Sequence, residues 1–211
     1  MNTIMTNTRL EDVRKRALKD LQQADVLLDG HFDYGNGYHG RVYVNPHMLF
    51  RHPSTIWRLA QDILDILPFD LSDKVDAVVG PVTGGALLAH TLAGLLEGRR
   101  SLKHPPCLFA PVHFAENDQL RLRTAYARML AGRRVIIADD VRNTGKTLAQ
   151  CAELVREAGA EVQATVQIYD RMEAIVQLDV PNFALIEYGA PANYPTPQCP
   201  LCAAGEPLTT F

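Results

Sequence analysis

The stretch from Arg133 to Leu148 reads R-R-V-I-I-A-D-D-V-R-N-T-G-K-T-L, and the rest of the chain can be organised around it. Val135 to Ala138 form a short apolar run bounded by charged residues, which is typical of a strand buried on both faces of a parallel sheet. Two carboxylates, Asp139 and Asp140, follow this run, and a turn-prone loop then leads into an amphipathic run from Lys146 to Ala158. The stretch therefore predicts a strand, an acidic pair, a tight loop and the start of a helix, in that order.

This order of elements suits a ligand that carries a phosphate. Ligands of open parallel sheets bind at the carboxyl ends of the strands, and the free N–H groups at a helix N-terminus favour an anion. Two carboxylates beside such a loop make sense if the ligand also carries hydroxyl groups or Mg²⁺. The pattern therefore indicates a sugar phosphate.

The stretch allows two other interpretations. Gly145-Lys146-Thr147 matches the end of a nucleotide P-loop, but that motif requires a glycine five residues before Gly145, where this chain has Asp140. A carboxylate at that place would repel a phosphate. The other alternative is an ordinary polar turn with a solvated acidic pair, since polar turns after strands are common.

Composition narrows the class of protein. The chain has 211 residues, of which 47% are hydrophobic and 21% are charged, with a net charge of -3. The length and composition predict one globular domain with a substantial core. The negative net charge gives no excess of basic residues for binding nucleic acid. We expect no membrane span and a cytoplasmic location, because the first ten residues are polar and no apolar run is long enough. Four cysteines do not make a disulfide framework in a chain of this size.

Periodicity predicts most of the remaining elements. Amphipathic helices are expected over 9–28 and 53–67, the second with Trp57 in its buried stripe. A Gly-, His- and aromatic-rich segment over 30–46 suggests a short strand or hairpin, whose rings could stack on a flat heterocycle or only on one another. Further strands are expected near Val75, Cys107 and Val162, and in the tail from Asn182. A second strand-loop-helix unit contains Gly84 and Gly85, which let backbone N–H groups approach a phosphate closely.

These motifs resemble type I phosphoribosyltransferases, and orotate phosphoribosyltransferases most of all. The hydrophobic strand with Asp139, Asp140 and the Thr/Gly loop resembles the signature of that family for phosphoribosyl diphosphate (PRPP). Gly30-His31-Phe32, Gly37 and Asn45 are similar to the N-terminal hood of the orotate enzymes. Asp170, Arg171 and Glu173 resemble their D-R-x-E motif, and the C-P-L-C tail resembles that of some members.

The resemblance implies a role for each candidate residue. Asp139 and Asp140 would be catalytic and hold the ribose hydroxyls. Tyr43 and Arg171 would face the base, and His39 would lie near the diphosphate. The 5′-phosphate would bind to the loop of Arg142, Asn143, Thr144, Gly145, Lys146 and Thr147, and the diphosphate to the loop of Val82, Thr83, Gly84 and Gly85.

Two departures from the family leave alternatives open. The family lid carries a lysine, whereas this chain has no lysine between Lys103 and Lys146, so Arg121 and Arg123 are the candidates for that role. Asn143 stands where the family usually has a threonine that touches the base. The alternatives to orotate transfer are therefore a phosphoribosyltransferase for another base and a non-catalytic PRPP-binding regulatory protein.

The cysteine pair at the C-terminus, Cys199 and Cys202, supplies two of the four ligands that zinc needs. No histidine is near the pair in the sequence, so a metal would need ligands from elsewhere, such as a second subunit. The sequence alone therefore does not support a zinc site.

Taken together, the resemblance implies an α/β fold with a parallel core sheet flanked by helices and an N-terminal hood. We expect one phosphoribosyltransferase domain over 1–211, with a hood over 1–50, a core over 70–190 and a Pro- and Cys-containing tail over 191–211. The expected partners are PRPP, which carries Mg²⁺ without a direct protein ligand, a nitrogenous base, and a second copy of the chain in a homodimer.

Overall fold

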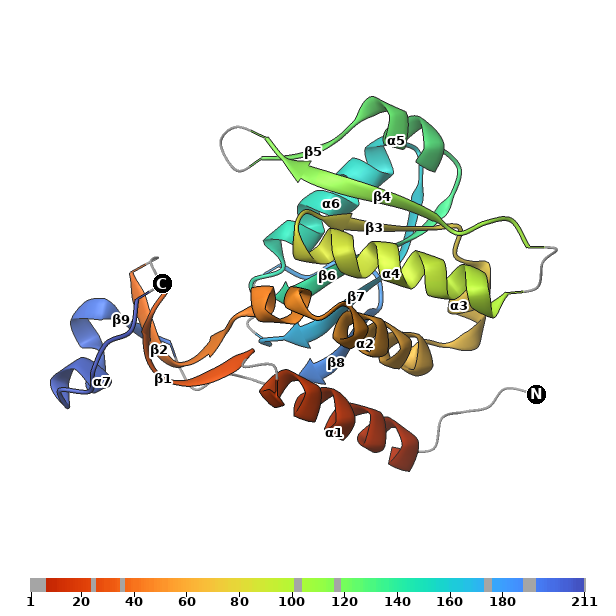
Figure 1. Ribbon diagram of the computed structural model, residues 1–211. Helices are drawn as coiled ribbons and strands as arrows, with labels where there is room; N and C mark the ends of the chain where they lie inside the picture. The colour runs from red at the N-terminus through yellow and green to blue at the C-terminus, as the bar shows by residue number, and fades with distance from the viewer. Residues whose placement is uncertain are drawn as a thin grey trace.

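The computed structural model describes residues 7–23, 26–34, 37–100, 104–115, 119–172, 176–187 and 193–210. It has a layered α/β body, from which a smaller hood projects to one side (Figure 1). The helices are α1 (Asn7–Gln23), α2 (Pro53–Ile66), α3 (Phe69–Lys74), α4 (Gly84–Arg99), α5 (Thr124–Leu130), α6 (Lys146–Glu157) and α7 (Pro200–Ala203), with 3-10 turns at Pro46–Arg51 and Thr196–Gln198.

The body is built on one sheet of six strands in the order β5-β4-β3-β6-β7-β8. All neighbouring strands are parallel except β4 and β5, which form an antiparallel pair. The predicted parallel α/β core is thus confirmed. The strands are β3 (Ala77–Pro81), β4 (Leu108–Phe114), β5 (Leu120–Leu122), β6 (Arg134–Arg142), β7 (Glu161–Asp170) and β8 (Asn182–Glu187).

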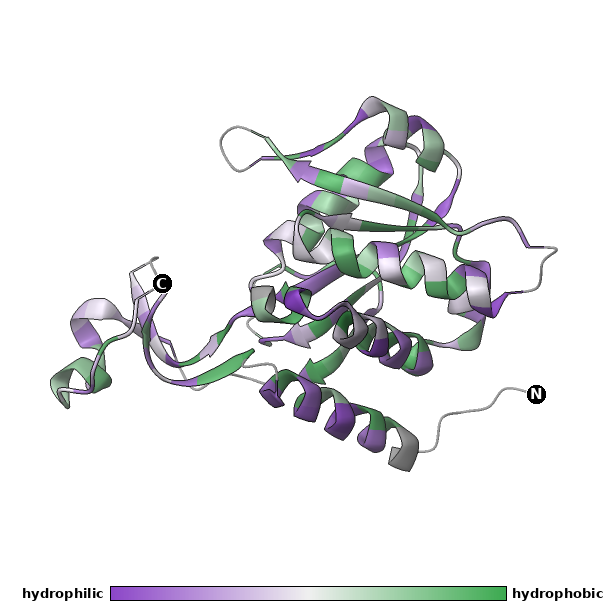
Figure 2. Ribbon diagram, in the orientation of Figure 1, coloured by the Kyte–Doolittle hydropathy of each residue, from purple (hydrophilic) through white to green (hydrophobic). Residues whose placement is uncertain are grey.

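Side chains on the central strands alternate between two hydrophobic clusters, as the two-residue period of a strand requires. On β3, Val78 packs in the cluster that includes α1, α2 and α4, whereas Ala77 and Val79 pack in the cluster beneath α5 and α6. This burial on both faces explains why the central strands read as continuous apolar runs. Figure 2 shows the outer helix α1 changing between hydrophilic and hydrophobic along its turns, as expected of an amphipathic helix.

The hood is a three-stranded sheet in the order β1-β2-β9. Its strands are β1 (Leu27–Asp33), β2 (Tyr38–Val44) and β9 (Tyr194–Pro195), and α7 lies beside them (Figure 1). The predicted hairpin is confirmed. The C-terminal tail joins the hood rather than the core sheet: Asp33 N–H donates to the Thr209 carbonyl over 3.0 Å, and Thr209 N–H donates to the His31 carbonyl over 2.8 Å.

Two local predictions are wrong. The first helix ends at Gln23, not Leu28, because Leu27 and Leu28 pair with β2 and so belong to the hood. Trp57 is 48% exposed and lies on the outer side of α2. On that helix Leu59, Ala60 and Ile63 occupy the core positions instead.

The segment after β4, expected to be a loop or a lid, forms the β4–β5 hairpin and α5 in its described part.

Candidate functional site

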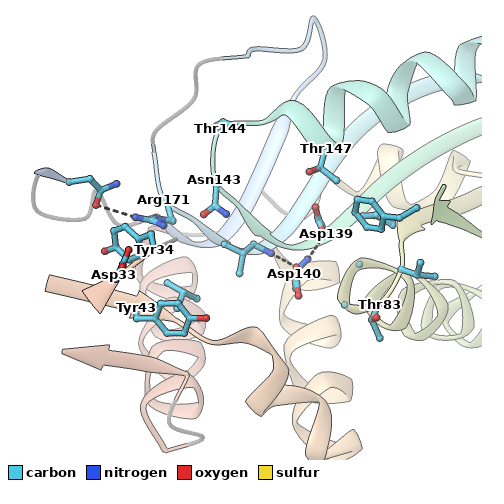
Figure 3. A pocket seen from close by; sticks show the side chains of 18 of the residues that line it. Asp33, Tyr34, Tyr43, Thr83, Asp139, Asp140, Asn143, Thr144, Thr147 and Arg171 are labelled. Carbon is cyan, nitrogen blue, oxygen red and sulfur yellow. Dashed lines mark hydrogen bonds between the residues drawn. The ribbon is translucent and has the colours of Figure 1, made fainter. Parts of the chain in front are cut away.

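A cleft of about 870 Å³ lies between the hood and the carboxyl ends of β3, β6 and β7. Strand ends contribute one wall and hood residues contribute the other (Figure 3). The cleft brings together many of the residues singled out in the sequence, namely Tyr43, Val82, Thr83, Gly84, Gly85, Asp139, Asp140, Asn143, Thr144, Thr147 and Arg171.

The acidic pair ends the apolar part of β6. Successive strand residues point to opposite faces, and the two carboxylates accordingly point in different directions in Figure 3. Asp139 is buried, and its Oδ1 accepts a hydrogen bond from Asp140 N–H over 3.0 Å. Burial raises the pKa of Asp139 well above its ordinary value, and the neighbouring charge of Asp140 raises it further. The pair therefore combines one solvent-facing carboxylate with one that holds a proton more readily than usual.

The loop after the acidic pair turns into α6 at Gly145. This glycine has φ of +83°, in the left-handed region, and the Cβ of any other residue would come 2.5 Å from the Val176 carbonyl oxygen. Glycine is therefore required here both for the backbone turn and for the close approach. The turn leaves the N–H groups of the first turn of α6 next to the cleft side chains Thr144 and Thr147.

A buried ion pair anchors the start of the same loop. Arg142 Nη1 donates to Asp170 Oδ2 over 2.9 Å, and the two side chains are 12% and 1% exposed. Asp170 also accepts hydrogen bonds from Asn182 Nδ2 over 3.0 Å and from the Met172 N–H over 2.8 Å. The ion pair and these hydrogen bonds thus link the carboxyl ends of β6 and β7 to Asn182, the first residue of β8.

The loop between β3 and α4 faces the acidic pair. Gly84 and Gly85 are buried, and Cβ atoms there would collide with the Asp140 carboxylate and with Asp139 Oδ1, the latter at 2.8 Å. Only glycine allows the two loops to approach so closely. The Val82–Thr83 peptide bond in this loop is cis.

On the hood side, aromatic and polar groups surround Arg171. Its guanidinium carbon lies 5.2 Å from the centre of the Tyr34 ring, and Nη2 donates to Asn193 Oδ1 over 3.4 Å. Tyr43 on β2 packs against Phe32, with ring centroids 5.7 Å apart. This wall therefore presents a cation held between aromatic and amide groups (Figure 3), while Glu173, expected beside Arg171, lies outside the described residues.

Other candidate residues do not line this cleft. Arg142 faces Asp170, and Gly145 lies with it beside a second, smaller cavity. Lys146 is exposed at the start of α6, and Arg121 and Arg123 are exposed on and after β5. His39 is buried in the hood, where its Nδ1 lies 3.3 Å from Cys202 Sγ.

The cysteine pair has histidine neighbours in the structure, although none lies near it in the sequence. His31 on β1 and His39 on β2 both lie against Cys199 and Cys202. The sequence conceals this arrangement because the histidines precede the cysteines by more than 150 residues, and only the folding of the tail onto the hood brings them together.

Several residues lining the cleft were not singled out from the sequence. They come from the hood, the tail and the ends of β3, β4 and β6, and they are Asp33, Tyr34, Val44, Pro81, Phe114, Val141, Asn193 and Thr210. Asp33 and Tyr34 directly follow the Gly30-His31-Phe32 motif, so their position beside it could have identified them as candidate site residues. Asn193 and Thr210 carried no local signal.

Among the described residues, no helix is both long and apolar enough to cross a bilayer.

Comparisons with known proteins agree with this geometry. The phosphoribosyl transferase domain family matches residues 48–182. The chain is 30% identical over 182 residues to orotate phosphoribosyltransferase of Erythrobacter litoralis, covering 86% of each chain. It is 31% identical over 187 residues to orotate phosphoribosyltransferase of Thermotoga maritima, covering 89% of this chain and 92% of that protein.

Solved structures share the fold at lower sequence identity. The crystal structure of orotate phosphoribosyltransferase from Aeropyrum pernix aligns with a TM-score of 0.62 at 23% identity, covering 80% of this chain and 92% of that one. Adenine phosphoribosyltransferase from Thermoanaerobacter pseudethanolicus aligns with a TM-score of 0.61 at 20% identity, covering 80% and 99%. From the match over the core sheet and the identity across most of its length, the chain belongs to the phosphoribosyl transferase domain family.

Proposed function

We propose that this protein transfers the phosphoribosyl group of PRPP to orotate, giving orotidine 5′-monophosphate and diphosphate. The observation that carries the proposal is the cleft itself, in which an acidic pair and two glycine-containing strand-end loops face the hood, with Arg171 at the end of β7 lying against the hood residue Tyr34. The names of the relatives support orotate as the base.

The 5′-phosphate is proposed to bind at the loop from Arg142 to Thr147. The N–H groups in the first turn of α6 have no partner within the helix, and the helix dipole favours an anion there. The hydroxyls of Thr144 and Thr147 line the same part of the cleft. Arg142 contributes by holding the loop through Asp170 rather than by reaching the cleft.

The diphosphate is proposed to bind at the opposite loop, Val82 to Gly85. Glycines at 84 and 85 keep side chains out of the space between this loop and the acidic pair. Backbone N–H groups at the start of α4 can then approach phosphate oxygens closely. His39 is excluded from this role by its burial in the hood, away from the cleft lining.

The base is proposed to lie against the hood, between Tyr43 and Arg171. Orotate carries a carboxylate, and a guanidinium can bind a carboxylate through two parallel hydrogen bonds. Because Tyr34 and Asn193 contact Arg171, its planar group is oriented before the ligand arrives. A base without a carboxylate would not use this cation in the same way.

In the proposed reaction, a nitrogen of the base attacks the anomeric carbon while the bond from that carbon to diphosphate breaks. Asp139 and Asp140 hold the ribose hydroxyls, and positive charge that develops on the sugar is stabilised by the carboxylate of Asp140. Catalysis then rests on positioning and electrostatic stabilisation, and it needs no nucleophilic side chain.

Magnesium is proposed to enter with PRPP. The cleft offers only oxygen donors near the diphosphate loop, including Asp140 and the Thr83 hydroxyl, and hard oxygen atoms suit Mg²⁺ and its water shell. When bound through PRPP, the ion would neutralise charge on the leaving diphosphate, and no direct protein ligand is proposed for it.

The lid, the assembly and the location complete the proposal. Arg121 and Arg123 lie outside the cleft of their own chain, on the β4–β5 hairpin and directly after it. In a dimer, these arginines would reach the diphosphate in the cleft of the partner subunit. We therefore propose a cytoplasmic homodimer in which an arginine replaces the lysine of the family lid.

A substrate panel tests the proposed function. Diphosphate release from PRPP and Mg²⁺ is measured with orotate, with uracil, adenine, guanine and hypoxanthine, and without any base. Release with orotate alone is expected. Release with another base instead would assign a different specificity, and PRPP binding without release for every base would identify a regulatory protein.

A further inference from the structure

Four metal-ligating side chains meet in the hood. His31 on β1 and His39 on β2 are each 3% exposed, and Cys199 directly before α7 is 4% exposed. Cys202 lies within α7 and is exposed, so it forms the solvent-facing side of the group. One ligand atom from each residue lies within 4.8 Å of the other three.

Four of the six separations between these atoms match tetrahedral coordination. Zinc bonds of about 2.05 Å to nitrogen and 2.3 Å to sulfur place two nitrogens about 3.3 Å apart and a nitrogen and a sulfur about 3.6 Å apart. His31 Nε2 lies 3.2 Å from His39 Nδ1. The nitrogen-sulfur distances are 3.5 and 3.7 Å from His31 Nε2 to Cys199 and Cys202, and 3.3 Å from His39 Nδ1 to Cys202.

The outer nitrogens of both imidazoles point to acceptors. His31 Nδ1 lies 2.9 Å from the Glu206 carbonyl oxygen, and His39 Nε2 lies 3.9 Å from Asp33 Oδ1. Histidines that bind metal commonly direct their second nitrogen at a carbonyl or a carboxylate, which selects the tautomer. The tautomer with both N–H groups directed outward leaves the lone pairs of His31 Nε2 and His39 Nδ1 for a metal ion beside the two sulfurs.

The outer half of the hood has only a small apolar core among the described residues. Neither hydrophobic cluster of the body includes Phe32, Cys199 or Leu201, which are the buried apolar residues there. The strand β9 has two residues and α7 has four. Units this small usually depend on a metal or a disulfide for stability, and the described cysteines are all free.

We propose that His31, His39, Cys199 and Cys202 bind one structural zinc ion that fastens the C-terminal tail to the hood. Two thiolates and two imidazoles are a donor set that selects zinc, and four protein ligands leave no open position for chemistry. The four residues lie outside the segment that matches the family domain, 48–182. The site therefore lies outside the matched domain, and none of its four residues lines the cleft of the proposed reaction.

The zinc site would also fix the positions of residues that line the cleft. Asp33, which faces His39, lines the cleft, and so do Asn193 and Thr210 from the tail. Fastening the tail to the hood therefore holds these three residues on the base side of the cleft.

Metal content is the first test. The full chain is purified without an affinity tag that binds metal, and its zinc is measured by mass spectrometry. One zinc per chain is expected for the wild type and for Cys107→Ala, a control that removes a buried thiol of the body. Cys202→Ala is expected to weaken zinc binding by more than the roughly 10- to 100-fold that loss of an outer partner costs.

Cobalt substitution and hydrogen exchange complete the test and do not depend on enzyme activity. Co²⁺ added to the metal-free chain should give tetrahedral d–d bands and a thiolate charge-transfer band, both lost in Cys202→Ala and His39→Ala. Metal removal should speed amide exchange over 31–33, 38–40 and 194–209 and leave the body strands unchanged. A chain without zinc that also gives no tetrahedral cobalt spectrum would overturn the proposal, as would full zinc binding by both variants.

Discussion

Replacing Gly84 with alanine should disrupt the meeting point of the two cleft loops. A Cβ at this position would lie 2.6 Å from the carboxyl carbon of Asp140 and 2.6 Å from Cζ of Phe50. Non-bonded carbon atoms approach to about 3.5 Å at their optimum, so the Asp140 carboxyl has to move by about 1 Å. The substitution thus shifts a proposed catalytic group without changing its chemistry.

The size of the effect follows from that displacement. Misplacing a catalytic group by about 1 Å costs roughly 100-fold in rate, which corresponds to about 2.7 kcal/mol of transition-state free energy. We therefore expect kcat/KM for PRPP, measured by diphosphate release, to fall about 100-fold. Gly94→Ala is the matched control: it lies exposed on the same helix, and its Cβ would meet nothing within 4 Å. It should leave the rate unchanged and stabilise the helix by about 0.5–1 kcal/mol.

A double-mutant cycle separates the collision from a general loss of folding. In an Asp140→Ala background the displaced carboxylate is absent, so Gly84→Ala should cost much less there than in the wild type. Thermal unfolding of each variant shows whether the protein remains folded. A Gly84→Ala rate within about twofold of wild type, far below the 1.4 kcal/mol of a tenfold change, would refute the reasoning.

Three further predictions concern the carboxylates. Asp140→Asn should strongly reduce PRPP use, measured by diphosphate release, while circular dichroism stays that of the wild type; an unchanged rate would remove this residue from the mechanism. Because the folded-state pKa of Asp139 is raised, the folded protein binds a proton there that the unfolded chain has lost, so the free energy of unfolding falls as pH rises from about 4 toward that raised pKa. Asp139→Asn cannot ionise, so its Tm should exceed that of wild type by a margin that grows between about pH 4 and the raised pKa; a margin that stays constant with pH would contradict this. Asp170→Asn leaves Arg142 buried without its counter-charge and should cost about 3–5 kcal/mol in urea unfolding, whereas Asp179→Asn at an exposed pair should not change the midpoint.

Much of the body could be predicted from the sequence because its signals are local. An apolar run followed by two carboxylates and a turn identified β6, the acidic pair and the start of α6 from sixteen adjacent residues. The same reasoning found β3 with its glycine loop. Trp57 failed this reasoning because helical spacing allows two neighbouring stripes, and only the packing of α2 against α4 selects one.

The hairpin and the tail of the hood differ in how well the sequence predicts them. The hairpin was visible from its glycines and aromatic residues, but α1 was predicted too long because Leu27 and Leu28 continue an apolar pattern that a helix and a strand can share. The tail gave only a cysteine pair with two ligands missing. Its pairing with β2 and its contact with β1 were not encoded in any short window.

Local sequence patterns were sufficient for most elements of the body, the acidic pair, the glycine loops and the family resemblance, because each depends on residues adjacent in the chain. The tertiary structure alone decided that Arg142 faces Asp170, that Asn193 and Thr210 reach the cleft, and that His31 and His39 meet Cys199 and Cys202. These contacts join residues far apart in sequence. Their free energy comes from packing that is spread over the whole fold, and no local pattern records it.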